Sequence, residues 1–134
     1  MSQERVATLM RAMEAFNRGD SSVPIAISTP EVEWGAIGAF PGVEVRYRGP
    51  HGIEEWMEAI RSAWEVFEVS VDEVLYDEGD LLVMAELLRG RGRSSGADVQ
   101  MRIFTVYRFE EGKIRKREAF TERNEALEAA GLSG

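Results

Sequence analysis

The hydrophobic period of the chain changes once, and this change limits the folds that the sequence can adopt. In two early segments, 4–17 and 53–64, the apolar residues recur every three or four positions, which is typical of amphipathic helices. Beyond residue 66 they alternate with polar residues in runs separated by short turn sequences. Helices followed by a series of neighbouring strands predict an α+β fold with an antiparallel sheet.

Turn residues set the expected boundaries of the remaining elements. The glycine-rich segment 35–49 reads as a long loop, of the kind that forms a lid or a pocket rim. We predict a curved antiparallel sheet wrapped over three N-terminal helices, forming a cone with an internal pocket, in a single domain over residues 1–134. A short second helix is expected within 21–28, a C-terminal helix at 125–130, and strands at 31–34, 67–71, 81–93, 99–109 and 113–121.

The composition excludes several classes of partner and of site. The 134 residues include 16 Lys and Arg against 24 Asp and Glu, and the resulting net charge of -8 repels nucleic acid and anionic lipid. Cysteine is absent and His51 is the only histidine, so one subunit cannot build a thiolate or multi-histidine metal site. Because no long apolar run or secretory signal is visible, we expect a cytoplasmic protein without a metal or cofactor.

Five short motifs spread over nearly the whole chain carry a family resemblance. They are 17–20 (NRGD), 47–53 (YRGPHGI), 90–96 (GRGRSSG), 111–114 (EGKI) and 125–132 (EALEAAGL). The chain resembles the SnoaL-like proteins of the nuclear-transport-factor-2-like superfamily. This resemblance implies a homodimer. It also implies relatives with varied functions: ketosteroid isomerases, limonene epoxide hydrolases, polyketide cyclases, dehydratases and noncatalytic binding domains.

The resemblance also indicates where two known chemistries would lie in this chain. The tyrosine, the base and the acid of the isomerase correspond to Ala12, Trp34 and Thr105. The two catalytic aspartates of the epoxide hydrolase correspond to Glu86 and Ala119. Among these positions only Glu86 keeps a carboxylate, so we expect neither mechanism in its known form.

The last hairpin predicts which side chains face the pocket. A three-residue loop at 110–112 would pair Tyr107 with Arg115 and Thr105 with Arg117, and the resemblance makes this face the inner one. Tyr107 and Thr105 can each donate a hydrogen bond to a ligand oxygen. Arg115 and Arg117 can either bind a ligand carboxylate or extend to solvent at the pocket rim.

Glu86 is the most informative residue, because the alternation around it places a carboxylate on the apolar face of a strand. Such a group is costly to bury unless it is paired or hydrogen-bonded. Three alternatives stay open. The strand can be shifted by one residue, leaving Glu86 in solvent. Glu86 can form a structural pair with Arg117, or it can be a functional acid or base whose pKa is raised by apolar walls.

We therefore expect a protein whose pocket binds a small apolar or amphipathic molecule. It would be an isomerase, cyclase, dehydratase or hydrolase with Glu86 as acid or base. The alternative is a noncatalytic ligand-binding or dimerisation domain, in which a partner subunit covers Phe104 and Val106 on the outer sheet face. The residues expected to line the pocket are Met10, Met13, Trp34, Met84, Leu88, Met101, Ile103, Thr105, Tyr107 and Arg117.

Overall fold

The computed structural model describes residues 2–36 and 46–132, so most of the loop expected at 35–49 lies outside the described residues. None of the helices in these two ranges has the length and apolarity needed to cross a membrane. The elements in chain order are α1 (Ser2–Asn17), α2 (Ser22–Ala26), β1 (Ser28–Gly35), β2 (Arg46–Arg48), α3 (Gly49–Ala63), β3 (Trp64–Glu78), β4 (Leu81–Gly92), β5 (Asp98–Glu110), β6 (Lys113–Phe120) and α4 (Arg123–Ala129).

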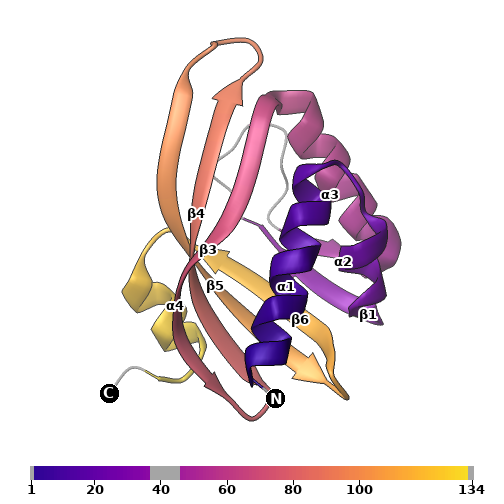
Figure 1. Cartoon of the computed structure of the whole chain (residues 1–134), viewed down its shortest axis with the longest axis vertical. Helices are drawn as coiled ribbons and strands as arrows, with labels where there is room; N and C mark the ends of the chain where they lie inside the picture. The colour runs from indigo at the N-terminus through magenta and orange to yellow at the C-terminus, as the bar shows by residue number, and fades with distance from the viewer. Residues whose placement is uncertain (1, 37–45, 133–134) are drawn as a thin grey trace.

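The strands form one sheet in the order β2-β1-β6-β5-β4-β3. Strands β3 to β6 are the expected antiparallel meander, whereas β1 joins β6 in parallel and β2 joins β1 in antiparallel orientation. Helices α1, α2 and α3 lie on one side of the curved sheet and α4 lies on the other (Figure 1). The predicted α+β fold, a sheet curved over three helices, is confirmed.

The main core lies between α1, α3 and the inner face of the sheet. The helical periods found in the sequence place the apolar stripes of these two helices inside this layer. Its buried residues include Leu9 and Met13 of α1, Ile53, Trp56, Met57 and Ile60 of α3, and Val32, Trp34, Leu82, Met84, Tyr107, Phe109 and Ile114 of the sheet.

Helix α4 covers the outer face of the sheet within the same chain. Ala126 of α4 and Ala130, which directly follows this helix, belong to one buried cluster with Val83, Phe104 and Val106 of the sheet. Only 7% of Phe104 and 0% of Val106 is exposed. The expectation that a partner subunit covers Phe104 and Val106 is therefore wrong, because α4 folds back from β6 and buries both.

The turn of the last hairpin is shorter than the sequence analysis expected. Glu110 pairs with Lys113, so the loop consists of Glu111 and Gly112 alone. Their φ angles are 51° and 81°, and two successive residues with positive φ are typical of the type I′ turn. The three-residue loop was therefore a wrong prediction.

A β-bulge in β6 corrects the predicted register. The pairing shifts after Phe109, so that Arg115 has no partner on β5 and its side chain is exposed. Beyond the bulge Tyr107 pairs with Arg117 and Thr105 pairs with Ala119, two residues away from the predicted partners. The extra residue explains why Arg117 faces the core while Arg115 faces solvent.

Trp64 begins β3, one residue after α3 ends, although the sequence pattern placed it in the helix. Its ring packs directly on Gly90 of β4. A Cβ atom at residue 90 would lie 2.9 Å from Trp64 Cε3 and 3.1 Å from the carbonyl oxygen of Val66. Position 90 therefore requires glycine because of this close approach.

We predict that Gly90→Ala lowers the free energy of unfolding by about 1–3 kcal/mol, because the added methyl group forces apart packed groups. Urea unfolding measures this change. Arg89→Ala, at the exposed neighbouring position, serves as the control, with an expected effect within about 0.5 kcal/mol. Equal stability of the two variants would contradict the packing of Trp64 on Gly90.

Candidate functional site

A cavity of about 40 Å³ lies between the helices and the inner face of the sheet. A buried water needs about 10–15 Å³ by the same kind of measure, so the cavity has room for about three or four water-sized groups. Three ionisable side chains reach it: Glu86, Tyr107 and Arg117. The other lining residues are Leu9, Ala12, Met13, Phe16, Pro24, Ile27, Trp34, Trp56 and Val69.

Glu86 lies on the inner face of β4 and is completely buried, with 0% of its surface exposed. The hydroxyl of Tyr107 on β5 donates a hydrogen bond of 2.7 Å to Glu86 Oε2. Tyr107 is itself only 3% exposed. The alternative in which Glu86 lies in solvent is therefore wrong, and the alternation read from the sequence placed it on the correct face.

Arg117 brings a buried positive charge to the same cavity. Its guanidinium carbon lies 5.0 Å from the ring centroid of Trp34 and 5.2 Å from that of Trp56. Its Nη1 donates a hydrogen bond of 2.7 Å to the carbonyl oxygen of Gly35. Two aromatic faces and a carbonyl thus hold the cation in a protein interior that would otherwise disfavour it.

The three ionisable groups change one another's titration. Burial raises the pKa of Glu86 above its ordinary value of 4.5, and the charge of Arg117 opposes this rise most strongly. The Tyr107 hydrogen bond and a weaker interaction with Thr105 act in the same direction as Arg117. Burial and the neighbouring Glu86 raise the pKa of Tyr107 well above 10.0, so its hydroxyl stays protonated and donates.

Arg117 acts on Glu86 through its charge rather than through a direct contact. Among the described side chains no ion pair joins the two groups, whereas Tyr107 lies opposite Arg117 and is bonded to Glu86. The prediction that Glu86 and Arg117 form a structural pair is therefore correct only in part, because the two charges attract each other without direct contact. The carboxylate remains available for another role.

Two polar atoms of the cavity lining have no hydrogen-bond partner among residues 2–36 and 46–132. These are Oε1 of Glu86 and Nε1 of Trp34, both buried. An indole N–H only donates, whereas a carboxyl oxygen accepts when ionised and can donate when protonated. A ligand with one oxygen function can therefore meet a donor and an acid–base group in the same cavity.

The structure brings four of the expected site residues to the cavity: Trp34, Glu86, Tyr107 and Arg117. Met13 lines it as well, but Met10 is 49% exposed on α1. The remaining expected residues lie outside the lining: Met84, Leu88, Ile103 and Thr105 are buried in the sheet, and Met101 is half-buried on β5.

Sequence reasoning treated Trp56 as a core residue and did not single out Phe16 or Val69 for the lining. A helical or alternating period predicts that such residues are buried, but many buried residues touch no cavity. For Phe16 the available signal was its position one helical turn after Met13, which was already selected. Within the described ranges, no group of three or more His, Cys, Asp or Glu side chains could hold a metal ion.

Comparison with known proteins shows which family and which solved structures are similar to this chain. The SnoaL-like domain profile matches residues 9–117, and no curated protein matches the sequence. An NTF2-like protein from Burkholderia pseudomallei superposes with a TM-score of 0.78 at 20% identity, covering 92% of this chain and 95% of that chain. Likenesses at this level of identity establish the fold alone.

Two further solved structures are similar. A protein from Catenulispora acidiphila with a ketosteroid isomerase-like fold, in complex with trimethylamine, gives a TM-score of 0.73 at 13% identity, covering 94% of this chain and 93% of that chain. A putative SnoaL-like polyketide cyclase from Jannaschia gives 0.74 at 18% identity, covering 99% of this chain and 94% of that chain.

The raised pKa of Glu86 predicts a pH-dependent cost to stability. Protonated Glu86 is favoured in the folded state, so its contribution is fully present below pH 4.5 and is lost as pH rises through the folded pKa. Between these two values the wild type should lose about 1.4 kcal/mol per pH unit relative to Glu86→Gln. Urea unfolding of both proteins across this range measures the difference. Glu68→Gln, at an exposed site, should follow the wild type, and a pH-independent difference for Glu86→Gln would contradict the assignment.

Tyr107→Phe should raise the pKa of Glu86 further, because the hydrogen bond that stabilises its charged form is removed. Carboxyl ¹³C NMR of the labelled protein measures the titration directly. The expected result is a Glu86 midpoint at higher pH than in the wild type. A midpoint that is unchanged or lower would show that Tyr107 does not stabilise the carboxylate.

Proposed function

The chain belongs to the SnoaL-like domain family, and we propose that it is a cofactor-independent enzyme that transfers a proton on a small, largely apolar molecule through Glu86. The observation that carries this proposal is the buried Glu86 carboxyl, which has one oxygen bound by Tyr107 and the other unpartnered in the cavity. A carboxyl with a raised pKa exchanges protons more readily near neutral pH than an ordinary one.

The charges around the cavity favour a substrate that develops negative charge on an oxygen. In the proposed step Glu86 Oε1 accepts the proton from a carbon next to a carbonyl group. The electron pair of that C–H bond moves toward the carbonyl oxygen, where the charge of Arg117 and the N–H of Trp34 stabilise it. Protonated Glu86 then returns the proton, so no cofactor is consumed.

Two of the similar structures support a small-molecule role. The Jannaschia protein is described as a putative polyketide cyclase, and the Catenulispora protein holds trimethylamine, a molecule with few heavy atoms. Isomerases, cyclases and dehydratases share a proton transfer at a carbon beside a carbonyl. The proposed step is therefore common to three of the four reaction types that the sequence analysis named.

One observation favours a noncatalytic alternative. The positive charge of Arg117 compensates Glu86 within a cavity of about 40 Å³, so the cluster can persist as a structural feature that binds a small molecule without reaction. The homodimer that the resemblance implies fits either function, and light scattering of the purified protein tests it.

We predict that the wild type accelerates exchange of the α-hydrogens of acetone in D₂O, measured by ¹H NMR. Glu86→Gln should reduce the enzymatic exchange rate by about a hundredfold or more, because the amide cannot carry the proton. Glu68→Gln should exchange at the wild-type rate. Equal rates for the wild type and Glu86→Gln would remove Glu86 from the chemistry, and a wild-type rate no faster than buffer would favour noncatalytic binding.

A further inference from the structure

A second hollow, of about 200 Å³, opens where α1 and α3 end beside the first residues of β3. We call it the arginine groove, because three guanidinium groups line it. It is larger than the Glu86 cavity and shares only Phe16 with it. The lining residues are Phe16, Asn17, Arg18, Gly19, Met57, Ile60, Arg61, Trp64, Glu65, Phe67 and Arg93.

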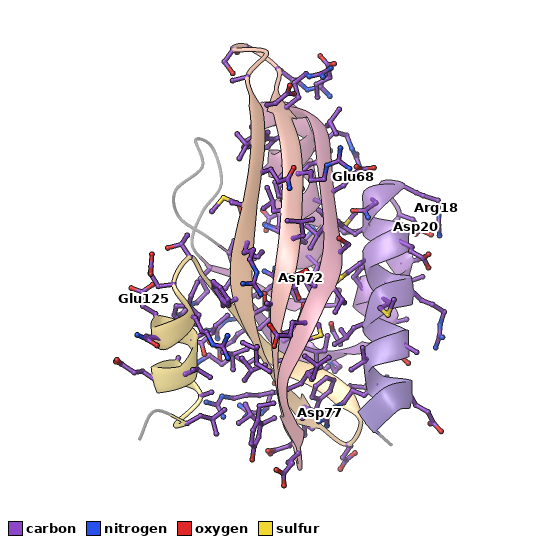
Figure 2. All side chains as sticks on the ribbon, turned by 60° about the vertical axis from the view of Figure 1, so that its left-hand side comes forward. Arg18, Asp20, Glu68, Asp72, Asp77 and Glu125 are labelled. Atoms are coloured by element: carbon purple, nitrogen blue, oxygen red, sulfur yellow. The ribbon has the colours of Figure 1, made fainter. Side chains whose placement is uncertain are left out.

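Three separate elements bring the arginines to this groove. Arg18 directly follows α1, as Figure 2 shows at the end of that helix, Arg61 lies in the last turn of α3, and Arg93 lies in the β4–β5 turn. Arg93 Nε donates to the carbonyl oxygen of Arg61 at 2.7 Å, and Arg61 Nη2 donates to that of Gly19 at 3.3 Å. These bonds fix the β4–β5 turn and the end of α1 against α3.

The groove has an excess of positive charge although the whole chain is acidic. Glu65 is the only carboxylate in its lining, and it lies 3.6 Å from Arg91, outside the groove. Within residues 2–36 and 46–132, neither Arg18 nor Arg93 forms an ion pair. With a net charge of -8 on the chain, anions are attracted only where such local excess exists.

Asp20, just outside the groove, has a lowered pKa, mainly because of its hydrogen bonds to Ser22 and in smaller part because of the charge of Arg18. Asp20 Oδ1 accepts hydrogen bonds from the hydroxyl and the backbone N–H of Ser22, at 2.6 and 2.9 Å. Glu58 lies 3.4 Å from Arg61, but both side chains are more than half exposed, and exposed pairs of this kind are weak. A charged ligand can therefore compete for the Arg61 guanidinium.

The floor of the groove is aromatic. Phe67 meets Phe16 edge to face at 5.8 Å between ring centroids and meets Trp64 at 5.6 Å. Phe16 also stacks on Trp56 at 4.9 Å, on the side of the inner cavity. An apolar floor below a cationic rim is complementary to a molecule with an apolar body and an anionic head.

We propose that the arginine groove binds a small carboxylate with an apolar body. The planar forks of Arg18, Arg61 and Arg93 match the two oxygens of a carboxylate, and its apolar body covers the aromatic floor. This site is separate from the Glu86 cavity and does not depend on the proposed proton transfer.

The three tryptophans allow one experiment to locate the ligand. Trp64 lines the groove, whereas Trp34 and Trp56 line the inner cavity, and each indole N–H gives its own signal in a ¹⁵N spectrum. Titration with benzoate should shift the signals of Trp64, Gly19 and Arg93 and leave that of Trp34 unchanged. Benzyl alcohol, which lacks the charge, and inorganic phosphate, which lacks the ring, should bind about tenfold more weakly or worse.

Variants of the rim test the role of the arginines. Arg93→Gln and Arg18→Gln should each weaken benzoate binding, and together by about tenfold or more. Within residues 2–36 and 46–132 the Arg18 side chain forms no hydrogen bond or ion pair, so Arg18→Gln keeps the test valid if Arg93→Gln fails to fold. Arg115→Gln, at the exposed bulge in β6, is the control and should bind like the wild type.

Several results would overturn the proposal. These are no benzoate binding, shifts at Trp34 in place of Trp64, or unchanged affinity in the Arg93→Gln and Arg18→Gln double variant. Equal binding of benzyl alcohol would show that the arginines do not select charge. Equal binding of phosphate would show a general anion site that makes no use of the aromatic floor.

Discussion

The burial of Glu86 is the constraint on which the inner site depends. An ionised carboxylate inside a protein costs several kcal/mol unless its environment compensates it. Tyr107 supplies a hydrogen bond and Arg117 supplies an opposite charge, but Arg117 must then be buried as well. Trp34 and Trp56 provide the aromatic faces that hold it, so the burial of one acidic residue on β4 is compensated by a chain of polar and aromatic neighbours in the cavity wall.

The hydrophobic periods in the sequence predicted those helices and strands whose buried face depends only on neighbouring residues. The three- and four-residue period of α1 and α3 and the alternation in β4 determined which faces are apolar, and these faces pack inside except at Met10, which is exposed. The same alternation placed Glu86 on the inner face, and family resemblance then identified the inner face of β5 that carries Tyr107. The strongest sign of the site in the sequence was Glu86, a carboxylate among apolar residues on the same face of a strand.

Two features of the structure were not predicted from the sequence. One depends on a single extra residue in β6, and the other depends on contacts between residues that are far apart in the chain. The segment from Glu110 to Gly112 is compatible with a two-residue and with a three-residue loop, and the structure combines the shorter loop with a bulge at Arg115. That bulge turns Arg115 outward while Arg117 stays on the predicted inner face, and no alternation pattern can show this difference. Helix α4 covers Phe104 because the chain folds back over the outer face of the sheet after β6. No local pattern in the sequence shows this path.

Phe16 separates two hollows with opposite electrostatic preferences. In the cavity Glu86 and Arg117 balance each other, so an anionic ligand would place a second negative charge beside a carboxyl that is already hard to ionise. The substrate that we propose for the cavity is therefore uncharged. Among the described residues Arg18 and Arg93 of the arginine groove form no ion pair and Arg61 forms one only with the exposed Glu58, so an anionic ligand gains more from them than an uncharged one. Phe16 thus lies between a cavity proposed for uncharged molecules and a groove proposed for anions, and the charges of each disfavour the ligand proposed for the other.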